Sequence, residues 1–337
     1  MRVYQLPKAE GIDDLTLTEA AEPVPQRGQV LVRMRATSLN YRDLMIVEGR
    51  YARAQVRPNL VPLSDGAGEV VAVGPDVTRF TPGDRVAGIF HQAWLAGEVS
   101  DAILGSALGG DLDGTLTEYR VFEAEGLVHL PSHLSYEEGA TLPCAAVTAW
   151  NALFGQRRVQ PGDTVLTLGT GGVSIFAIQF AHAAGARVIA TSSSDEKLDR
   201  AAKLGADDLI NYKRTPDWDE QVRQLTEGRG VDHVVEVGGA GTLPRSLQAV
   251  RRGGQVNVIG LLAGGGEIDP MIVLGRSILM RGIFVGSREM FEVMNRALAL
   301  RKLRPVIDRV FPFEQAAEAY RHLASGAHLG KVVVTIE

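Results

Sequence analysis

The sequence has very little cysteine: Cys144 is the only one among 337 residues. A single thiol cannot form a disulfide within the chain, and it leaves nothing from which to build a site of several cysteines. The sequence also lacks any long run of lysine or arginine, and its 35 basic residues are outnumbered by 40 acidic ones. We therefore do not expect a nucleic acid partner, because following a phosphate backbone takes a basic stripe or patch.

Long apolar runs are missing as well. No segment approaches the roughly 18 consecutive apolar residues of a membrane span, and residues 1–30 carry no basic-then-apolar signal pattern. These absences predict a cytoplasmic protein that does not contact a membrane. The chain does have 45% hydrophobic residues and the length of about two domains, so that packing alone can hold its cores.

The first third of the sequence is predicted to be mostly β. Apolar residues alternate over Gln29–Thr37, small and β-branched residues fill Gly66–Val73, and Gly83–Val86 is typical of a turn leading into a strand. Glycine, alanine and scattered polar residues then predict a long irregular loop over His91–Gly114. Strand character resumes at Thr115–Phe122.

After Pro161-Gly162 the pattern changes to strands that alternate with helices. The expected strands are Thr164–Leu168, Arg187–Thr191, Asp208–Asn211, His233–Val237, Gln255–Ile259 and Leu279–Val285, with helices near Val173–Ala184, Asp195–Leu204 and Leu243–Val250. Such alternation predicts a parallel sheet, and about six strands suit a doubly wound, Rossmann-type dinucleotide-binding domain.

The residues beyond Arg288 have no place in that sheet. They predict helices at Met290–Leu300 and Phe313–Ala324 and strands at Val306–Phe311 and Lys331–Ile336. We expect this tail to fold back onto the β-rich front part, which gives an α/β protein of two domains. Residues 1–125 and 289–337 would form the β-rich domain and residues 126–288 the Rossmann domain, with a ligand cleft where they meet.

A glycine-rich loop follows the first strand of the expected parallel sheet and opens a helix. Glycines let the backbone approach a pyrophosphate, and the amides at the start of the helix bind its charge. The expected contacts come from Gly169, Thr170, Gly171, Gly172 and Val173. Ser174 replaces a third glycine and is small enough to keep the helix close to the strand. A loop of this kind can also merely link a strand to a helix, but the strand pattern around it favours the cofactor site.

The end of the second strand indicates which nicotinamide cofactor is bound. A site that prefers NAD usually has an acid there, whose carboxylate binds the ribose 2′-hydroxyl. This chain has Ser192-Ser193-Ser194 and then Asp195-Glu196-Lys197. Hydroxyls and the Lys197 ammonium suit a 2′-phosphate, so we expect NADPH rather than NADH, with Asp195 as the opposing feature. Ser193 and Glu196 alternatively form a helix capping box, which still leaves Ser192 and Lys197 available.

With these elements placed, the sequence resembles the medium-chain dehydrogenase/reductase superfamily from Gln29 to the ending Gly330-Lys331-Val332-Val333. Asn40-Tyr41-Arg42-Asp43 is similar to the N-x-x-D motif of its quinone oxidoreductase branch, and Gly49-Arg50-Tyr51 to the G-x-Y of that branch. Leu142–Leu153 resembles the superfamily's interdomain helix. The resemblance implies a GroES-like β-rich catalytic domain and hydride transfer from NADPH to a quinone, an enone or an activated carbonyl.

The resemblance also implies further cofactor contacts. Lys197 and Tyr212 fall where NADPH-dependent quinone oxidoreductases place a lysine and a tyrosine near the 2′-phosphate. Gly238, Gly260 and Val285 lie near strand ends that approach the nicotinamide in the superfamily, although all three can be simple turns. Lys331 resembles a family lysine near the cofactor, but a lysine entering a last strand is otherwise typical of a solvated sheet edge.

Zinc alcohol dehydrogenases of the same superfamily would carry Cys, His and Cys where this chain has Asn40, Ser64 and Cys144. A catalytic zinc takes three protein ligands drawn from Cys, His, Asp and Glu, so one surviving thiol does not make a site, and we expect no metal. Cys144 is then expected to be a packed core thiol. Asp65 stands where those enzymes have a glutamate beside the metal, and it either faces the cleft or satisfies backbone amides.

Without a metal, hydrogen-bond donors must stabilise the oxyanion that forms in the reaction. Asn40 is the first candidate because its amide donates two hydrogen bonds and has no charge to desolvate. Asp43 would orient Asn40 or Arg42, or simply cap a turn. Tyr51 is the candidate proton donor, with Tyr41 as the substitute. The competing functions are a zinc-dependent alcohol dehydrogenase and a non-catalytic NADPH-binding sensor or structural protein.

The expected partners are a small-molecule substrate and a second copy of the chain. A homodimer is expected because the strand near Leu279–Val285 forms an open sheet edge that a second copy can cover. The substrate pocket would include Tyr41, Tyr51, His91, Trp94 and Arg288, although a lone His and Trp in an irregular loop equally well anchor that loop.

Overall fold

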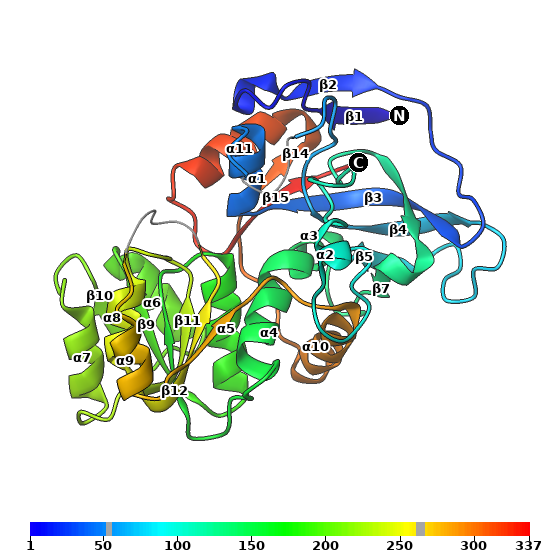
Figure 1. Cartoon of the computed structure of the whole chain (residues 1–337). Coiled ribbons are helices and arrows are strands. Elements are labelled where there is room, and N and C mark those ends of the chain that lie inside the picture. Colours follow the sequence, from blue (N-terminus) through cyan, green and yellow to red (C-terminus); the bar gives the residue numbers. More distant parts are fainter. Residues whose placement is uncertain (52–55, 261–266) are drawn as a thin grey trace. The chain divides into compact units, whose positions relative to one another are not determined.

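The protein folds into two compact units (Figure 1). The structure is a computed structural model, and it describes residues 1–51, 56–260 and 267–337. Unit 1 comprises Met1–Val147 and Gly286–Glu337, and unit 2 comprises Thr148–Val285. Residues 126–147, which the sequence pattern assigned to the Rossmann domain, belong to unit 1 here. The reason is local pairing: β7 (Leu127–His129) joins the sheet of unit 1 through β5 (Arg85–Gly88).

Unit 2 is built on a six-stranded sheet whose strands are all parallel. In sequence order these strands are β8 (Thr164–Thr167), β9 (Arg187–Ser192), β10 (Asp208–Asn211), β11 (Val231–Glu236), β12 (Val250–Val258) and β13 (Leu279–Gly282). In space they lie in the order β10-β9-β8-β11-β12-β13. The order reverses beside β8, as in a doubly wound dinucleotide-binding sheet, and this confirms the predicted fold class.

Helices cover both faces of this sheet, so its strands are buried on both sides and consist largely of apolar residues. They are α5 (Gly172–Ala183), α6 (Asp195–Lys203), α7 (Trp218–Leu225), α8 (Leu243–Ala249) and α9 (Pro270–Gly275). Figure 1 shows α7 and α8 on one side of the strands and α5 on the other. The core between β11, β12 and α8 includes Val234, Val256 and Leu247.

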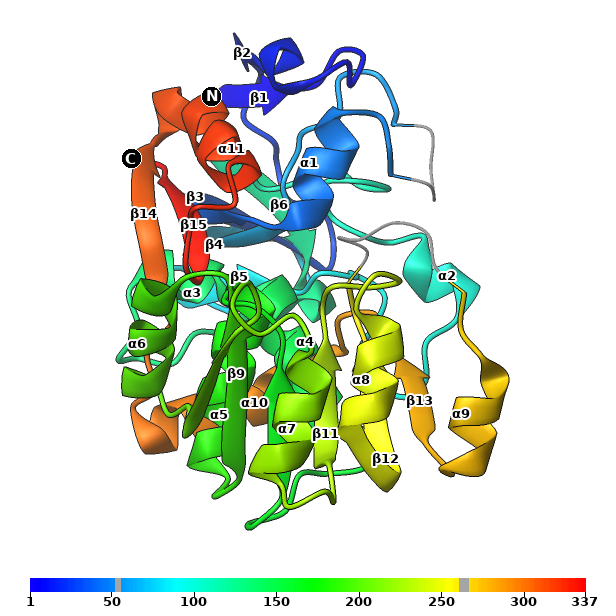
Figure 2. The ribbon, with the colours of Figure 1, turned by 90° about the vertical axis from the view of Figure 1, so that its left-hand side faces the viewer.

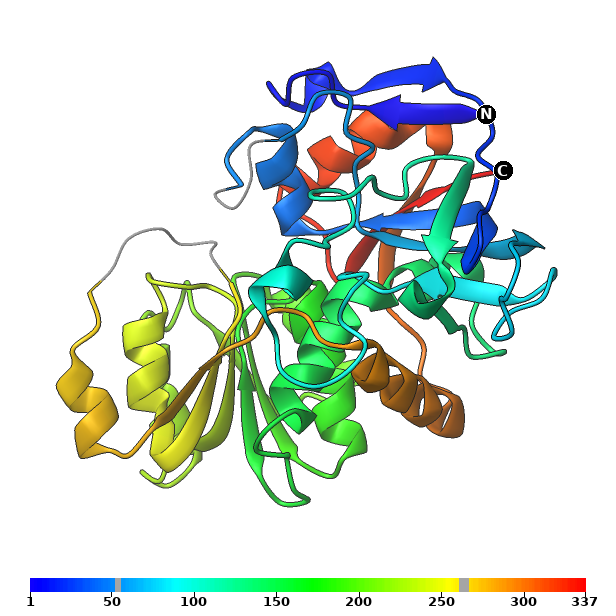
Figure 3. The ribbon, with the colours of Figure 1, turned by 45° about the vertical axis from the view of Figure 1, so that its right-hand side comes forward.

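Unit 1 contains a mostly antiparallel sheet with the order β14-β15-β3-β4-β5-β7, and β6 also pairs with β3. The additional strands are β3 (Gln29–Leu39), β4 (Asp65–Val73), β6 (Tyr119–Glu123), β14 (Ile307–Pro312) and β15 (Lys331–Thr335), beside a separate hairpin of β1 (Arg2–Gln5) and β2 (Thr16–Glu19). The C-terminal β15, red in Figure 3, pairs with the blue β3, so the tail joins the front sheet as expected.

The helices of unit 1 are short except for the one at Arg288. They are α1 (Tyr41–Val47), α2 (Asp101–Leu104), α3 (Tyr136–Ala140), α10 (Arg288–Arg301) and α11 (Ala316–Ala324). The predicted helix over Leu142–Leu153 consists of a wider π-helical turn, Leu142–Ala146, followed by α4 (Val147–Phe154). No helix in the described part of the chain is long and apolar enough to cross a membrane.

The predicted loop over 91–114 is irregular apart from α2. Trp94 is buried, and its indole Nε1 donates a hydrogen bond to the Gly97 carbonyl at 3.0 Å. Its backbone carbonyl accepts from the Arg288 amide at 2.9 Å. Trp94 therefore anchors the loop to the start of α10.

Candidate functional site

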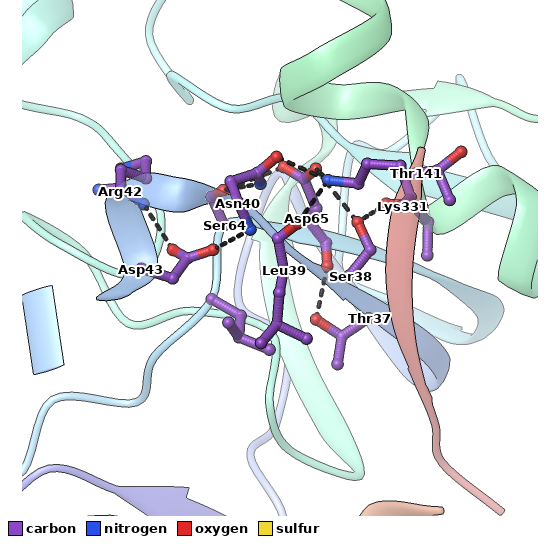
Figure 4. A network of polar contacts seen from close by, with 12 residues as sticks. Thr37, Ser38, Leu39, Asn40, Arg42, Asp43, Ser64, Asp65, Thr141 and Lys331 are labelled. Carbon is purple, nitrogen blue, oxygen red and sulfur yellow. Dashed lines mark hydrogen bonds and ion pairs between the residues drawn. The ribbon is translucent and has the colours of Figure 1, made fainter. Parts of the chain in front are cut away.

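A cluster of polar side chains gathers where β3 ends, and it draws on three distant parts of unit 1. β3 runs antiparallel to both β4 and β15, with Ser38 opposite Asp65 and Leu39 opposite Val332. The end of β3 therefore lies beside the start of both neighbouring strands. This register brings Asn40, Asp65 and Lys331 together, as Figure 4 shows.

Lys331 is buried in the middle of this cluster, with a side chain only 3% exposed. Its ammonium donates to the Leu39 carbonyl at 2.8 Å and to Asn40 Oδ1 at 2.6 Å, and it lies 3.3 Å from Asp65 Oδ2. These three acceptors match the three donors of an ammonium. The interpretation of Lys331 as a solvated edge charge is wrong, because β15 lies inside the sheet between β14 and β3.

The Lys331 ammonium fixes how the Asn40 amide is turned. An ammonium can only donate, so it selects the carbonyl oxygen of the amide and leaves Nδ2 on the other side. Asn40 Nδ2 has one long contact, 3.5 Å to Ser64 Oγ, and Ser64 Oγ in turn donates to Asp65 Oδ1 at 3.0 Å. One donor of this partly exposed amide is thus directed away from Lys331 and suited to bind an oxygen of a ligand.

Asp43 holds the backbone at Asn40 from the first turn of α1. Its Oδ2 accepts a hydrogen bond from the Asn40 amide at 2.7 Å, and its Oδ1 lies 3.3 Å from Arg42 Nη1. The Arg42 guanidinium packs over the Tyr51 ring, 5.1 Å from its centre. The structure therefore brings Asn40, Asp43 and Tyr51 into one neighbourhood, whereas Tyr41 is 41% exposed at the start of α1.

Burial raises the pKa of the Asp43 carboxyl to about 6, although the Arg42 charge and the Asn40 amide both act to lower it. The folded protein then binds this proton more tightly than the unfolded chain, where the pKa is 3.8. Its stabilising contribution is complete below pH 3.8 and is lost as the pH rises through about 6, by up to about 3 kcal/mol. We expect an Asp43→Asn variant, which cannot titrate, to lack this decrease.

Urea unfolding between about pH 4 and 7 measures how steeply the free energy of unfolding falls with pH in the wild type and in the variant. Asp76→Asn is the matched control, because Asp76 is a 63% exposed acid in the same unit and its replacement should keep the wild-type slope. Identical slopes for wild type and Asp43→Asn would contradict the prediction.

In unit 2, the glycine-rich loop has the geometry that a pyrophosphate needs. Gly169 has a φ of +70°, a conformation that favours glycine, and a Cβ added to Gly169 or Gly171 would meet only open space within 4 Å. Gly171 precedes α5, which begins with the partly exposed residues Gly172 and Val173. The buried Ser174 donates to the Leu168 carbonyl at 2.7 Å and ties the helix to the strand. These residues fit a dinucleotide.

The ends of β9 and β10 lie side by side and gather the residues expected near a ribose. The Tyr212 amide donates to the Ser192 carbonyl at 3.0 Å. Ser194 caps α6, because its Oγ accepts a hydrogen bond from the Lys197 amide. The alternative prediction that Ser193 caps the helix together with Glu196 therefore misses the capping residue by one position. Lys197 is half-buried on the first turn of this helix.

Asp195, the acid that opposed the NADPH prediction, is engaged by its neighbours. Arg214 contacts both of its oxygens, at 2.5 and 2.6 Å, and Asn211 Nδ2 donates to it at 2.8 Å. Arg214 was not among the residues expected near the cofactor. The sequence could have indicated Arg214, because a basic residue shortly after β10 lies at the same end of a parallel sheet as the last residues of β9.

Glu236, which was not among the residues expected at the site, and the expected Gly260 shape two of the remaining strand ends. Glu236, at the end of β11, accepts from the amides of Gly238 and Gly239 at 2.8 and 3.0 Å. Gly260 lies so close to the Val237 carbonyl that a Cβ would be 1.5 Å from its oxygen, so the position requires glycine. A carboxylate following an apolar strand was the signal that pointed to Glu236.

Val285 has a φ of +56°, which is rare for a β-branched residue and costs about 1–3 kcal/mol. Its carbonyl accepts from Asn151 Nδ2 at 2.7 Å, and Arg281 Nη2 donates to Asn151 Oδ1 at 2.9 Å. The buried Asn151 thus holds this unusual backbone in place. Nothing in the sequence pattern indicated that contact.

The polar cluster offers poor ligands to a metal ion. Within residues 1–51, 56–260 and 267–337 no three His, Cys, Asp or Glu side chains gather in a way that could hold one. The Lys331 ammonium lies beside Asp65 and Asn40, and a second positive ion there would be repelled. Burial, with the nearby Asp65 charge, raises the pKa of the Cys144 thiol.

Comparison with known proteins adds the family. Residues 26–132 match the alcohol dehydrogenase GroES-like domain, and residues 172–299 match the domain described as zinc-binding dehydrogenase. A zinc-type alcohol dehydrogenase-like protein of Schizosaccharomyces pombe is 50% identical over 93% of each chain. The chain belongs to the medium-chain dehydrogenase/reductase superfamily.

This medium-chain dehydrogenase/reductase also resembles proteins of two named activities. Human quinone oxidoreductase is 27% identical over all of this chain and 98% of its own. The crystal structure of an NAD-dependent alcohol dehydrogenase is 35% identical and superposes with a TM-score of 0.91 over the whole of both chains. The protein is therefore a nicotinamide-dependent oxidoreductase on the quinone-oxidoreductase-like branch of the superfamily.

Proposed function

We propose that the protein is a zinc-independent, NADPH-dependent reductase that transfers hydride to a quinone, an enone or an activated carbonyl. The observation that carries this proposal is the buried Lys331 ammonium between Asn40 and Asp65. Asn40 and Asp65 stand where zinc-dependent relatives would have a cysteine ligand and a glutamate beside the metal, and the Lys331 ammonium contacts both of them. A fixed positive charge in that place supports a site that works with hydrogen-bond donors rather than with zinc.

The side chains of unit 1 then have distinct tasks, while bound NADPH supplies the hydride. Asn40 Nδ2 donates to the substrate oxygen on which negative charge develops, and Lys331 keeps that amide turned the right way. Asp43 holds the Asn40 backbone and is a positioning residue. Tyr51 delivers the proton, with the exposed Tyr41 as the substitute.

The test is a panel of quinones, enones and aldehydes, in which oxidation of NADPH is followed by its absorbance with and without a zinc chelator. We expect at least one substrate class to be turned over at a rate that the chelator does not change. Activity that disappears on chelation and returns with zinc would overturn the zinc-independent assignment. Tight NADPH binding with no oxidation across the panel would instead favour a non-catalytic binding protein.

The preference for NADPH is supported by the charges around Ser192. The Asp195 carboxylate is bound by Arg214, and Lys197 stands on the same turn of α6. We expect Lys197→Ala to weaken NADPH binding by about tenfold or more, which is the effect of losing one charge-assisted hydrogen bond. NADH binding should change by less than about threefold, because NADH has no 2′-phosphate for a lysine to bind.

Fluorescence titration of both cofactors measures these affinities. Lys203→Ala is the matched control, since Lys203 is an exposed lysine in the last turn of the same helix and its removal should affect neither cofactor. A wild-type protein that binds NADH as tightly as NADPH would refute the preference.

We also propose a homodimer that forms through β13, one of the two edge strands of the parallel sheet of unit 2 in Figure 2. Leu279 and Met280 on this strand are 37% and 43% exposed, and Met271 and Leu274 on the preceding α9 are 62% and 70% exposed. A second copy that extends the sheet would cover both features.

Light scattering at micromolar concentration should give the mass of a dimer. Replacing both Leu274 and Met280 by glutamate should shift the protein to monomers without loss of the fold, because both side chains are exposed. Leu300→Glu, at an 81% exposed leucine of α10, should leave the dimer intact. A monomeric wild-type protein would rule the dimer out.

A further inference from the structure

Five arginine side chains line one hollow in unit 2, which has a volume of about 590 Å³. They are Arg223, Arg229, Arg251, Arg252 and Arg276, and Gln248 lies among them. In the sequence these arginines are spread over more than fifty residues and form no basic run. The fold gathers them, because α7, α8 and α9 stand side by side and end near the starts of the next strands (Figures 1 and 2).

The hollow lies at the end of the sheet where the strands begin, and the glycine-rich loop lies at the end where the strands finish. Arg229 comes just before β11, Arg251 and Arg252 lie at the start of β12, and Arg276 precedes β13. All strands of this sheet are parallel, so they all begin at one end of the sheet and finish at the other. The glycine-rich loop follows the end of β8. The hollow is therefore separate from the residues that fit the dinucleotide.

One acid neutralises part of this charge. Asp232 accepts from Arg229 Nη1 and Nη2 at 2.9 and 2.7 Å and from Arg251 Nε at 2.5 Å. Burial alone would raise its pKa, but the two arginines hold the pKa of Asp232 at about 2, so it stays ionised. A single carboxylate thus serves two guanidinium groups.

The other three arginines contact only neutral oxygens among the described residues. Arg223 Nη1 donates to the Gln248 carbonyl at 3.3 Å, Arg252 Nη1 to the Gly275 carbonyl at 2.6 Å, and Arg276 Nη2 to the Val250 carbonyl at 2.5 Å. Burial and the charges of Arg223 and Arg252 lower the pKa of Arg276. Like charges are therefore crowded here without an equal number of acids.

Capping of helix ends explains part of this arrangement. The carbonyls of Gln248 and Gly275 belong to the last turns of α8 and α9, where a cation is favourable. A helix end carries at most about half a negative charge. The ends of α7, α8 and α9 and Asp232 together offset about two and a half of the five positive charges, so a positive charge is left facing the hollow.

We infer that the hollow binds the phosphate chain of a small polyphosphorylated anion, which is either an inorganic oligophosphate or the phosphate tail of a nucleotide. A guanidinium matches phosphate oxygens with two parallel hydrogen bonds, and such charge-assisted bonds are stronger than those to carbonyls. The volume lies within the range of small-molecule sites. The described residues that line the hollow include no aromatic ring that could stack on a base, so the recognised part is the phosphate chain.

Calorimetric titration of the full-length protein with tripolyphosphate, in the presence of saturating nicotinamide cofactor, tests this site. We expect one anion to bind per chain, with an affinity that falls as salt is raised. Arg252→Gln should weaken binding by about tenfold or more, and Arg223→Gln together with Arg252→Gln should abolish it. Arg296→Gln, which removes the same charge from an exposed position of α10 in unit 1, should leave it unchanged.

Thermal unfolding and cofactor affinity, measured for each variant, show that the fold and the dinucleotide site are intact. Equal affinities for ATP and tripolyphosphate show that only the phosphate chain of the ligand is recognised. An affinity for ATP at least tenfold higher, with the same dependence on Arg252, identifies a nucleotide. The inference is overturned if tripolyphosphate does not bind at millimolar concentration, if saturating cofactor abolishes the binding, or if Arg252→Gln and Arg296→Gln have the same effect.

Discussion

Replacing Lys331 by methionine is expected to destabilise the protein by about 3–5 kcal/mol. The Lys331 ammonium is the cation beside Asp65, whose side chain has no exposed surface, and the substitution leaves this carboxylate uncompensated in the interior. Methionine has a similar length and fills the same space, so the loss comes from charge rather than from a cavity. Urea unfolding near neutral pH measures the change. Turnover should fall as well, because the Asn40 amide loses the contact that orients it.

The double variant Lys331→Met/Asp65→Asn separates the two effects. With both charges removed no unpaired ion is buried, so most of the lost stability should return. Turnover should stay low, because the Asn40 amide is still without the 2.6 Å contact to an ammonium. A single variant that loses less than about 1 kcal/mol would show that Asp65 does not depend on Lys331.

The sheet of unit 2 could be predicted from the sequence because each of its strands is a short apolar run followed by a helical segment. The first residue of a strand could not be predicted where pairing with another strand decides it. β12 starts at Val250 rather than at the predicted Gln255, since Val250 pairs with Val231 of β11. Arg251-Arg252-Gly253-Gly254 does not have the composition of a strand, and it lies in a register shift between the Val231–Val250 pair and the His233–Gln255 pair.

The contacts of the candidate sites were harder to predict than the residues themselves. Spacing cannot decide which of three consecutive serines caps α6, and the cap falls on Ser194. The burial of Lys331 depends on β15 being inserted between β14 and β3, which no local pattern encodes. The arginines of the hollow could not be recognised as a cluster either, because the segments that carry them are far apart in the sequence.

The Asn40→Asp variant is expected to lose about 100- to 1000-fold in kcat, the usual effect of removing one oxyanion donor. Aspartate has nearly the same shape and keeps an oxygen for the Lys331 ammonium, which lies 2.6 Å from Asn40 Oδ1. It replaces Nδ2 by a second oxygen, which cannot donate and which repels a developing oxyanion. NADPH affinity should be unchanged, because the glycine-rich loop and the residues around Ser192 are untouched. Steady-state kinetics with an acceptor found in the panel, together with cofactor titration, measures both quantities.

Tyr51→Phe is the companion variant, because it removes a proton donor and leaves every contact of Asn40 in place. Its turnover should also fall more than its NADPH affinity, but less steeply than in Asn40→Asp, since Tyr41 or water can supply a proton whereas no other donor is held by Lys331. Full turnover by Asn40→Asp would remove Asn40 from the reaction, and full turnover by Tyr51→Phe would do the same for the tyrosine. A parallel loss of NADPH binding in either variant would show that the residue serves the cofactor instead of the substrate.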